Sequence, residues 1–345
     1  MSRVLDFFRT FNDMALTSEQ ILTLQGIKGF GTGTVQKICA EAENHTGQIS
    51  SINDLHDLCL KLADSKVLTR VAPFSFDDFE RACSGARRIL DSSESLGIKV
   101  ASRYEASYPK KLLSTLDEMG RPSAPILVFY KGNLEVTEMP GIAIIGTRKP
   151  TPDGVRAGEY YAEAFAAAGT NVISGLALGC DAAAHRGALS AGGATTAILA
   201  NGLDSVYPSE NAYLADEILA NGGLLISENP VGTRANKYNL VARDRLQAGL
   251  ADATLVVQSS VKGGTMHAVN ATLKSGKVLY AITFKHDQGF ADEGNRYLIS
   301  EKGACSMRSS KEEIISSPEL FLPLCGSTKE PVPVQLDIFS GMELN

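Results

Sequence analysis

The chain has 345 residues, with 33 Lys and Arg against 39 Asp and Glu, a formal charge of −6 and no Trp. This length suits about two domains, and 44% hydrophobic with 21% charged residues is the composition of a globular protein. The acidic balance argues against a surface that attracts polyanions everywhere, so any nucleic-acid site must be a local basic patch. No run approaches the roughly 18 apolar residues of a membrane span, and we expect a cytoplasmic protein.

Six cysteines are scattered without a C-x-x-C pair, which disfavours a zinc site and a disulfide framework. We therefore expect no metal and no cofactor, and reduced thiols that are mostly buried.

Residues 1–95 have a helical pattern without strand-like runs. Thr17 stands three residues before Gln20, which predicts a capping box at a helix start. The segment from Leu24 to Ile38 resembles a helix-hairpin-helix element, whose glycines let backbone N–H groups approach a DNA phosphate. A tight turn that needs glycine only for its backbone angles is the alternative. The candidates for duplex contact are Lys28, Gly29, Gly31 and Lys37.

From residue 96 the pattern changes to short apolar runs that alternate with Ala-rich amphipathic stretches. The runs are GIAIIG, NVISG, ATTAILANG, GGLLISE, ATLVVQ and KVLYAIT, and the helix-like stretches are 153–168, 181–191, 211–221, 240–250 and 266–275. Such alternation indicates βαβ units and a buried parallel sheet. We predict an α/β protein with a Rossmann-like, doubly wound, mostly parallel sheet after a small all-helical domain. The predicted division is 1–95, 96–310 and a flexible tail over 311–345.

Several loops that follow these strands combine glycines, hydroxyl groups and cations. Parallel strands bring such loops to one carboxyl edge, where doubly wound sheets bind their ligands. Glycine turns and helix N-termini there form a cradle for phosphate. Residues 139–310 carry 15 Lys and Arg against 15 Asp and Glu, so binding must come from the placement of cations. The candidate DNA or phosphate contacts are Gly146, Thr147, Arg148, Lys149, Thr151, Gly154, Ser174, Gly175, Arg243, Arg245, Lys262, Gly263, Gly264 and Thr265.

Taken together and in this order, these motifs resemble the DNA-processing protein A family (DprA, also called Smf). The resemblance covers residues 96–306 and includes Tyr108-Pro109-Lys110-Lys111-Leu112 and Gly294-Asn295-Arg296-Tyr297. It implies a non-enzymatic single-stranded DNA binder that protects DNA and helps load a RecA-type recombinase in DNA uptake or recombination. A homodimer and an N-terminal helical domain are also implied.

The chain departs from the family pattern at several positions. The usual Phe-Pro-x-Arg-Asn-Arg is Leu240-Val241-Ala242-Arg243-Asp244-Arg245, and a usual Glu is Gln258. Gly263-Gly264-Thr265 replaces Ser-Gly-Ser. The lost aromatic predicts weaker base stacking, which is worth about 1–3 kcal/mol per base.

Two other functions remain open at this point. A nucleotide or nucleotide-sugar hydrolase of a related Rossmann-like fold would use a Gly-Gly-x-Gly-Thr loop with a nearby Glu, and here that acid is absent. A nucleotide-binding sensor, for example in phage defence, would signal through the helical domain.

Two smaller motifs carry their own alternatives. Asp181 and His185 are spaced as an acid–base pair on a helix, but a cap role for Asp181 with local packing of His185 is the favoured interpretation, and no catalytic residue is assigned. In the tail, Gln335, Leu336 and Phe339 are similar to the peptide by which bacterial proteins dock on the β sliding clamp; a plain hydrophobic tail end is the alternative.

Overall fold

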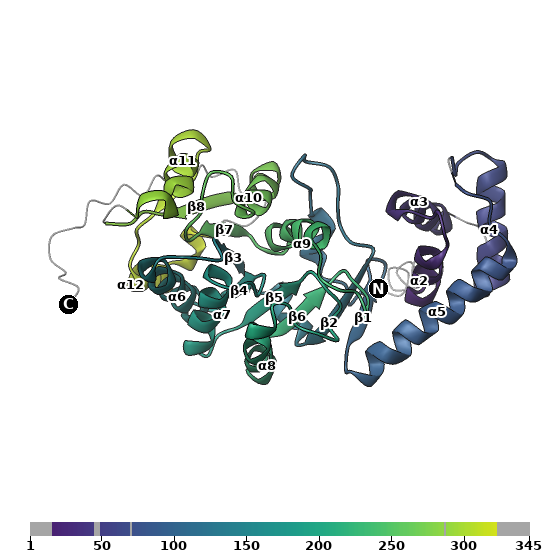
Figure 1. The fold of residues 1–345 in the computed structure, drawn as a ribbon, viewed down its shortest axis with the longest axis horizontal. Helices are drawn as coiled ribbons and strands as arrows, with labels where there is room; N and C mark the ends of the chain where they lie inside the picture. The colour runs from purple at the N-terminus through teal and green to yellow at the C-terminus, as the bar shows by residue number, and fades with distance from the viewer. Residues whose placement is uncertain (1–15, 45–48, 70, 286–287, 323–345) are drawn as a thin grey trace, which may run out of the picture.

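The computed structural model describes residues 16–44, 49–69, 71–285 and 288–322. Within these ranges the early part of the chain is helical, and all strands come after it (Figure 1). In the same ranges, no helix combines the length and the hydropathy that crossing a membrane requires.

The first helices begin at caps that are encoded in the sequence. Thr17 Oγ1 accepts the N–H of Gln20, and Gln20 Oε1 accepts the N–H of Thr17, so the predicted capping box is confirmed. Similar boxes at Ser51 and Ser75 start two later helices. The helices are α2 (Ser18–Gly26), α3 (Thr32–Glu43), α4 (Ile52–Asp64) and α5 (Phe76–Ser95).

A nine-stranded sheet follows, in the order β1-β2-β6-β5-β4-β3-β7-β8-β9. All neighbours from β6 to β9 pair in parallel, while β2 pairs antiparallel with both β1 and β6. The predicted mostly parallel, Rossmann-like sheet is thus confirmed. The strands are β1 (Lys99–Ser102), β2 (Leu127–Gly132), β3 (Gly141–Ile145), β4 (Asn171–Ser174), β5 (Thr195–Leu199), β6 (Leu224–Ser227), β7 (Ala253–Val256), β8 (Val278–Ile282) and β9 (Cys305–Met307).

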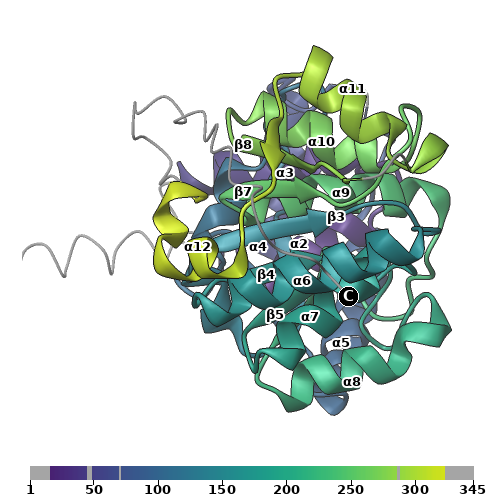
Figure 2. The ribbon, with the colours of Figure 1, turned by 90° about the vertical axis from the view of Figure 1, so that its left-hand side faces the viewer.

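Helices cover both faces of this sheet (Figure 2). On one face α6, α7 and α8 pack on the apolar strands, and on the other face α9, α10 and α11 do the same. The predicted helices agree with the observed ones to within three residues at each end. The five predicted helices are α6 (Pro152–Ala167), α7 (Cys180–Ser190), α8 (Ala212–Ala220), α9 (Lys237–Leu250) and α10 (Thr265–Lys274). The sequence analysis did not predict α11 (Glu293–Glu301). Short 3₁₀ turns are η1 (Lys110–Ser114), η2 (Leu134–Glu138), η3 (Ser209–Asn211) and η4 (Gly289–Ala291).

The expectation that a flexible tail begins at residue 311 is wrong for its first twelve residues. Helix α12 (Lys311–Ser316) and the turn η5 (Pro318–Leu320) pack beside α6. Ile314 is fully buried, and the Phe321 ring meets the Phe165 ring edge-on with centroids 6.0 Å apart. The Pro- and Ser-rich composition concealed these anchors, because a few apolar side chains suffice to dock a short segment on an existing core.

The helical region joins the sheet at its β1 edge. Helices α2 and α5 both contact β1, and their apolar side chains belong to one continuous core with β2 and β5 residues. At the junction, Ser18 Oγ donates to Glu105 Oε1 at 3.1 Å. The helices are therefore packed on the sheet domain rather than tethered to it by a free linker.

Candidate nucleic-acid interface

The strand order reverses between β3 and β7. From β3 the chain adds β4, β5 and β6 on one side, then crosses over through α9 and adds β7, β8 and β9 on the other. Loops diverge at such a point, so the carboxyl ends of the two strands flank a crevice. The loops after β3, β4, β5 and β7 and the first turns of α9 and α10 line a pocket of about 660 Å³ there.

The loop after β3 brings four of the candidate phosphate contacts to the pocket. Gly146, Thr147, Arg148 and Lys149 all line the pocket. At Gly146 a Cβ would lie 2.6 Å from Cys180 Sγ and 2.8 Å from the Gln258 carbonyl oxygen, so no larger residue fits without a shift. Both basic side chains of this loop are exposed. They provide mobile positive charge beside the N-terminus of α6, which adds a partial positive charge.

The next part of the same loop is structural. Thr151 Oγ1 accepts the Gly154 N–H and caps α6. Gln258 Oε1 accepts the Thr151 N–H at 2.9 Å while Gln258 Nε2 donates to Thr151 Oγ1 at 2.9 Å. The amide uses one acceptor and one donor at once, which a carboxylate cannot do. The departure at Gln258 thus holds the loop closed, and neither Thr151 nor Gly154 lines the pocket.

The loop after β4 also serves the scaffold. The Ser174 side chain is buried and donates to the Ile144 carbonyl at 2.7 Å. Gly175 is needed because a Cβ there would lie 1.8 Å from Arg243 Nη1. Two expected phosphate contacts therefore act beneath the pocket rather than in it.

The structure corrects the expected role of Arg243. Its side chain is buried, with 4% of the residue exposed, and Nη1 donates to the Ile198 carbonyl at 2.5 Å. Nε donates to Asp244 Oδ1 at 3.1 Å. The guanidinium also lowers the pKa of Asp181, against the larger effect of burial. Arg243 thus forms part of the pocket floor as the counter-ion of two carboxylates.

Arg245 requires a similar correction. Its guanidinium binds both oxygens of Glu228 at 2.8 and 2.6 Å, and Nε donates to Ser123 Oγ at 2.7 Å. Only 15% of the side chain is exposed, and it does not line the pocket. The residues of α9 that line the pocket share one face of the helix, namely Lys237, Leu240, Val241, Arg243, Asp244 and Gln247. Arg245 is two residues, or about 200°, beyond Arg243 and therefore points away from the pocket.

The loop after β7 brings three further candidates to the pocket. Gly263, Gly264 and Thr265 line the pocket at the start of α10, and Lys262 lies exposed next to them. The Gly263 N–H donates to the Ser260 carbonyl and fixes the turn.

Several residues of the pocket are absent from the predicted site, and four of them are polar or aromatic residues at its helix starts and loops. Asn236 and Lys237 at the start of α9, Tyr207 after β5 and His267 in α10 all line the pocket. A signal for Lys237 was available in the sequence, because it lies at the start of a helix that follows a parallel strand, as Lys149 lies just before one. Among the described residues, no ion pair involves Arg148, Lys149 or Lys237, and the same holds for Lys262 and the exposed Arg234.

Asp181 and His185 do not form a pair. Gly179 is the cap of α7, so Asp181 lies in the first turn, where its carboxylate accepts the N–H groups of Gly175 and Ala177 at 3.2 and 3.3 Å. The expected cap is thus displaced by two residues. Burial raises the pKa of Asp181, Arg243 lowers it and Asp244 raises it, and the result is a pKa of about 6. His185 Nδ1 instead meets Thr195 Oγ1 at 2.7 Å, and Nε2 has no partner.

We expect His185 to make the fold sensitive to acid. Burial, together with Arg243 and Arg186, lowers its pKa to about 3. Below pH 6.5 this histidine is protonated in the unfolded chain but stays neutral in the native state. The free energy of unfolding therefore falls as pH falls, by about 2 kcal/mol at pH 5. The raised pKa of Asp181 has the opposite effect on the pH dependence of stability. The contribution of His185 is therefore obtained by comparing the parent with a variant at this position. In urea unfolding at pH 7.5 and 5, His185→Gln should lose about 2 kcal/mol less than the parent. An equal loss in both proteins would contradict this.

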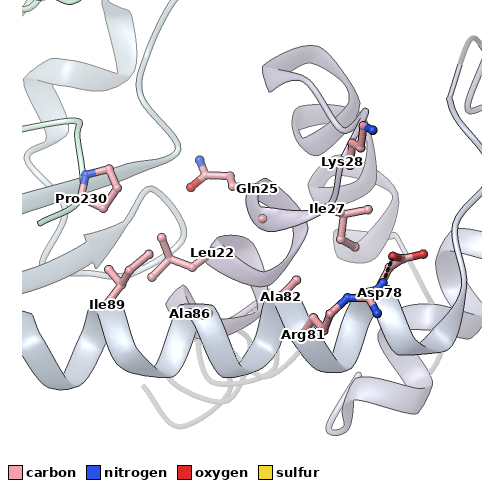
Figure 3. A pocket seen from close by; sticks show the side chains of 12 residues that line it. Leu22, Gln25, Ile27, Lys28, Asp78, Arg81, Ala82, Ala86, Ile89 and Pro230 are labelled. Carbon is pink, nitrogen blue, oxygen red and sulfur yellow. Dashed lines mark hydrogen bonds and ion pairs between the residues drawn. The ribbon is translucent and has the colours of Figure 1, made fainter. Parts of the chain in front are cut away.

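The candidate duplex contacts lie in the helical region. Gly29, with φ of 91°, makes the turn between α2 and α3, and Gly31 caps α3. The side chains of Lys28 and Lys37 are exposed. Lys28 also lines a second, 530 Å³ pocket, where Leu22 on α2 and Ile89 on α5 lie opposite Pro230 from the loop after β6 (Figure 3). Gln335, Leu336 and Phe339 lie outside the described residues.

Residues 99–318 match the family model of the DNA recombination-mediator protein A. The chain belongs to this family. Protein Smf of Escherichia coli is 34% identical over 215 residues, which are 62% of this chain and 55% of Smf. DNA processing protein DprA of Bacillus subtilis is 29% identical over 67% of this chain and 75% of its own length.

Solved structures agree with this DprA assignment. The X-ray structure of DprA from Streptococcus pneumoniae matches with a TM-score of 0.68 at 26% identity, over 88% of this chain and 98% of that one. DprA from Helicobacter pylori matches with a TM-score of 0.55 at 27% identity, over 64% of this chain and 95% of that one, and its structure was described for a unique single-stranded DNA binding mode. In sequence, the match spans 37% of the Synechocystis Smf, 55% of the E. coli Smf and 62% of the S. pneumoniae DprA.

The departures from the DprA pattern at Leu240 and Asp244 both lie in the pocket. Leu240 places an aliphatic side chain where the family pattern has an aromatic. Asp244 adds a carboxylate beside Arg243, and burial raises its pKa while Arg243 and His267 oppose. The floor of the pocket is therefore less positive than its rim.

Proposed function

We propose that this protein binds single-stranded DNA in the pocket at the β3/β7 switch point and acts as a recombination mediator. The observation that supports it is a group of exposed cations around a glycine-lined pocket at the carboxyl edge of the sheet, none of which forms an ion pair with another described residue. Arg148, Lys149 and Lys237 line the pocket, and Arg234 and Lys262 extend the group. Phosphate contacts supply sequence-independent affinity, which suits a protein that accepts any incoming strand.

The further parts of the proposal follow from the family. The protein would protect single strands without catalysing a reaction on them, deliver them to a RecA-type recombinase, and work as a homodimer in the cytoplasm. Within the described ranges, no group of three His, Cys, Asp or Glu side chains is placed to hold a metal ion. We propose a division into a helical domain over residues 1–95 and a Rossmann-like domain from 96 to 322. A clamp-binding role for the remaining residues stays a proposal from their sequence.

The salt dependence of binding tests the site quantitatively. If five cations each contact one phosphate of the bound strand, the logarithm of the binding constant should fall with the logarithm of salt concentration with a slope of about −3.5. Each contact contributes about −0.7 to this slope. A fluorescent oligo-dT titrated at several salt concentrations measures this slope. A slope near zero, or tight binding of mononucleotides in place of oligo-dT, would favour a nucleotide-binding sensor. Addition of a RecA-type recombinase to the preformed complex tests the mediator role.

A further inference from the structure

The pocket has an aromatic surface that does not come from the position where the family pattern places one. One tyrosine lines the pocket, and a second follows a lining residue in the chain. Tyr207, 48% exposed, lines the pocket from the loop after β5. Tyr238, 85% exposed, follows the lining residue Lys237 in the first turn of α9. Single exposed aromatics are ordinary. Here two lie on segments that line one polar pocket, beside cations that form no ion pair within the described part of the chain, and this needs an explanation.

The segments that carry the two rings are fixed to each other. The Gly202 N–H donates to the Thr233 carbonyl at 2.9 Å, and the Gly232 N–H donates to Asp204 Oδ1 at 2.9 Å. A Cβ on Gly202 would lie 2.4 Å from the Pro230 carbonyl oxygen, which shows how closely the two loops pack. The loop with Tyr207 and the segment that leads into α9 therefore form one unit.

The start of α9 is fixed as well. Asn236 Oδ1 accepts the Asn239 N–H at 3.0 Å and caps the helix, while Asn239 Nδ2 reaches Asn229 Oδ1 at 3.4 Å. Tyr238 is thus held by its backbone although its ring is free. A rigid backbone with an exposed ring binds at little cost in conformational entropy, because a tyrosine has only two side-chain torsions to fix.

We propose that Tyr207 and Tyr238 form a stacking surface for the bases of the bound strand and replace the aromatic that is missing at Leu240. This inference rests on the proposed DNA-binding function and assigns the bases a place in it. Lys237 and Arg234 are exposed on the same segment as Tyr238. They contact the phosphates of the strand while its bases stack on the rings. Aromatic side chains between cations are the arrangement by which single strands are bound without sequence preference.

The test compares a strand that has bases with one that lacks them. The probes are oligo-dT and an abasic oligonucleotide of the same length. Tyr207→Ala and Tyr238→Ala should each weaken oligo-dT binding about tenfold and leave the salt slope unchanged, because stacking releases no counterions. Neither change should alter the affinity for the abasic strand. The parent should bind the abasic strand about as weakly as the double variant binds oligo-dT.

Controls separate stacking from other causes. Tyr213, 53% exposed in the first turns of α8, does not line the pocket, so Tyr213→Ala should bind like the parent. The Phe variants keep the ring and should retain affinity, whereas Leu variants, which keep bulk without a π face, should behave like the Ala variants. The chain has ten Tyr and no Trp, so quenching of its fluorescence by oligo-dT reports on tyrosine directly and should shrink in the double variant.

The two levels of failure are distinguishable. If the parent does not bind oligo-dT, the proposed function is wrong. If the parent binds with the expected salt slope but the Tyr207 and Tyr238 variants bind equally well, the stacking surface is wrong and the DNA site stands. A parent that binds abasic and complete strands with equal affinity also overturns the inference. Circular dichroism of each variant confirms that its fold is intact.

Discussion

Replacing Arg243 by alanine is expected to lower the free energy of unfolding by about 3–5 kcal/mol at pH 7.5. The guanidinium is the buried partner of Asp244 and an electrostatic partner of Asp181, and its removal leaves both carboxylates in a low-dielectric site. It also leaves the Ile198 carbonyl without the donor it has in the parent. Urea unfolding followed by circular dichroism measures the change.

The pH dependence of this loss identifies its cause. The pKa of Asp181 is raised to about 6 even with Arg243 present, and losing the cation raises it further. A carboxyl whose native pKa lies above its unfolded value favours the folded state as pH falls through that native pKa. The cost of Arg243→Ala should therefore be smaller at pH 5 than at pH 7.5.

A matched control separates this role from phosphate binding. Arg148→Ala removes the same charge from an exposed side chain and should change stability by no more than about 0.5 kcal/mol. If Arg243→Ala instead kept full stability and lost only DNA affinity, the sequence-based expectation of a direct phosphate contact would be restored.

The fold was largely predictable because its signals are local. Apolar runs such as Gly141–Ile145 are buried on both faces, which is why they read as strands of a parallel sheet. The order of loops along the chain then placed the site at the carboxyl edge, since topology leaves few alternatives. The antiparallel pairing of β2 with β6 and the docking of Phe321 depend on contacts between distant residues, which periodicity does not encode.

Side-chain direction was the part of the site that sequence could not give. Arg243 and Arg148 have the same charge and follow similar motifs, yet one is buried against Ile198 and the other is exposed. The difference comes from the glycine at position 175, whose missing Cβ makes space for the guanidinium. A cation beside a glycine-rich loop can thus be either a ligand contact or a structural counter-ion, and only the packing decides.

The largest loss of DNA binding is expected from the double variant Arg148→Ala/Lys149→Ala. Both side chains are exposed at the pocket beside the N-terminus of α6. A hydrogen bond to a charged group contributes about 1.5–3 kcal/mol, so two such contacts correspond to a loss of about 100-fold or more in affinity for oligo-dT. The loss should be uniform across sequences, because phosphates carry no sequence information.

The salt slope distinguishes this effect from a distortion of the loop. Removal of two phosphate contacts should flatten the slope by about 1.4, from about −3.5 to about −2. A control that removes the same net charge elsewhere is Lys99→Ala/Lys302→Ala, two exposed cations that do not line the pocket. It should leave both affinity and slope nearly unchanged, because a Debye length of about 8 Å screens remote charges at physiological salt. If the two double variants weakened binding equally, attraction would come from overall charge, and the group of cations around the switch-point pocket would not be the DNA site.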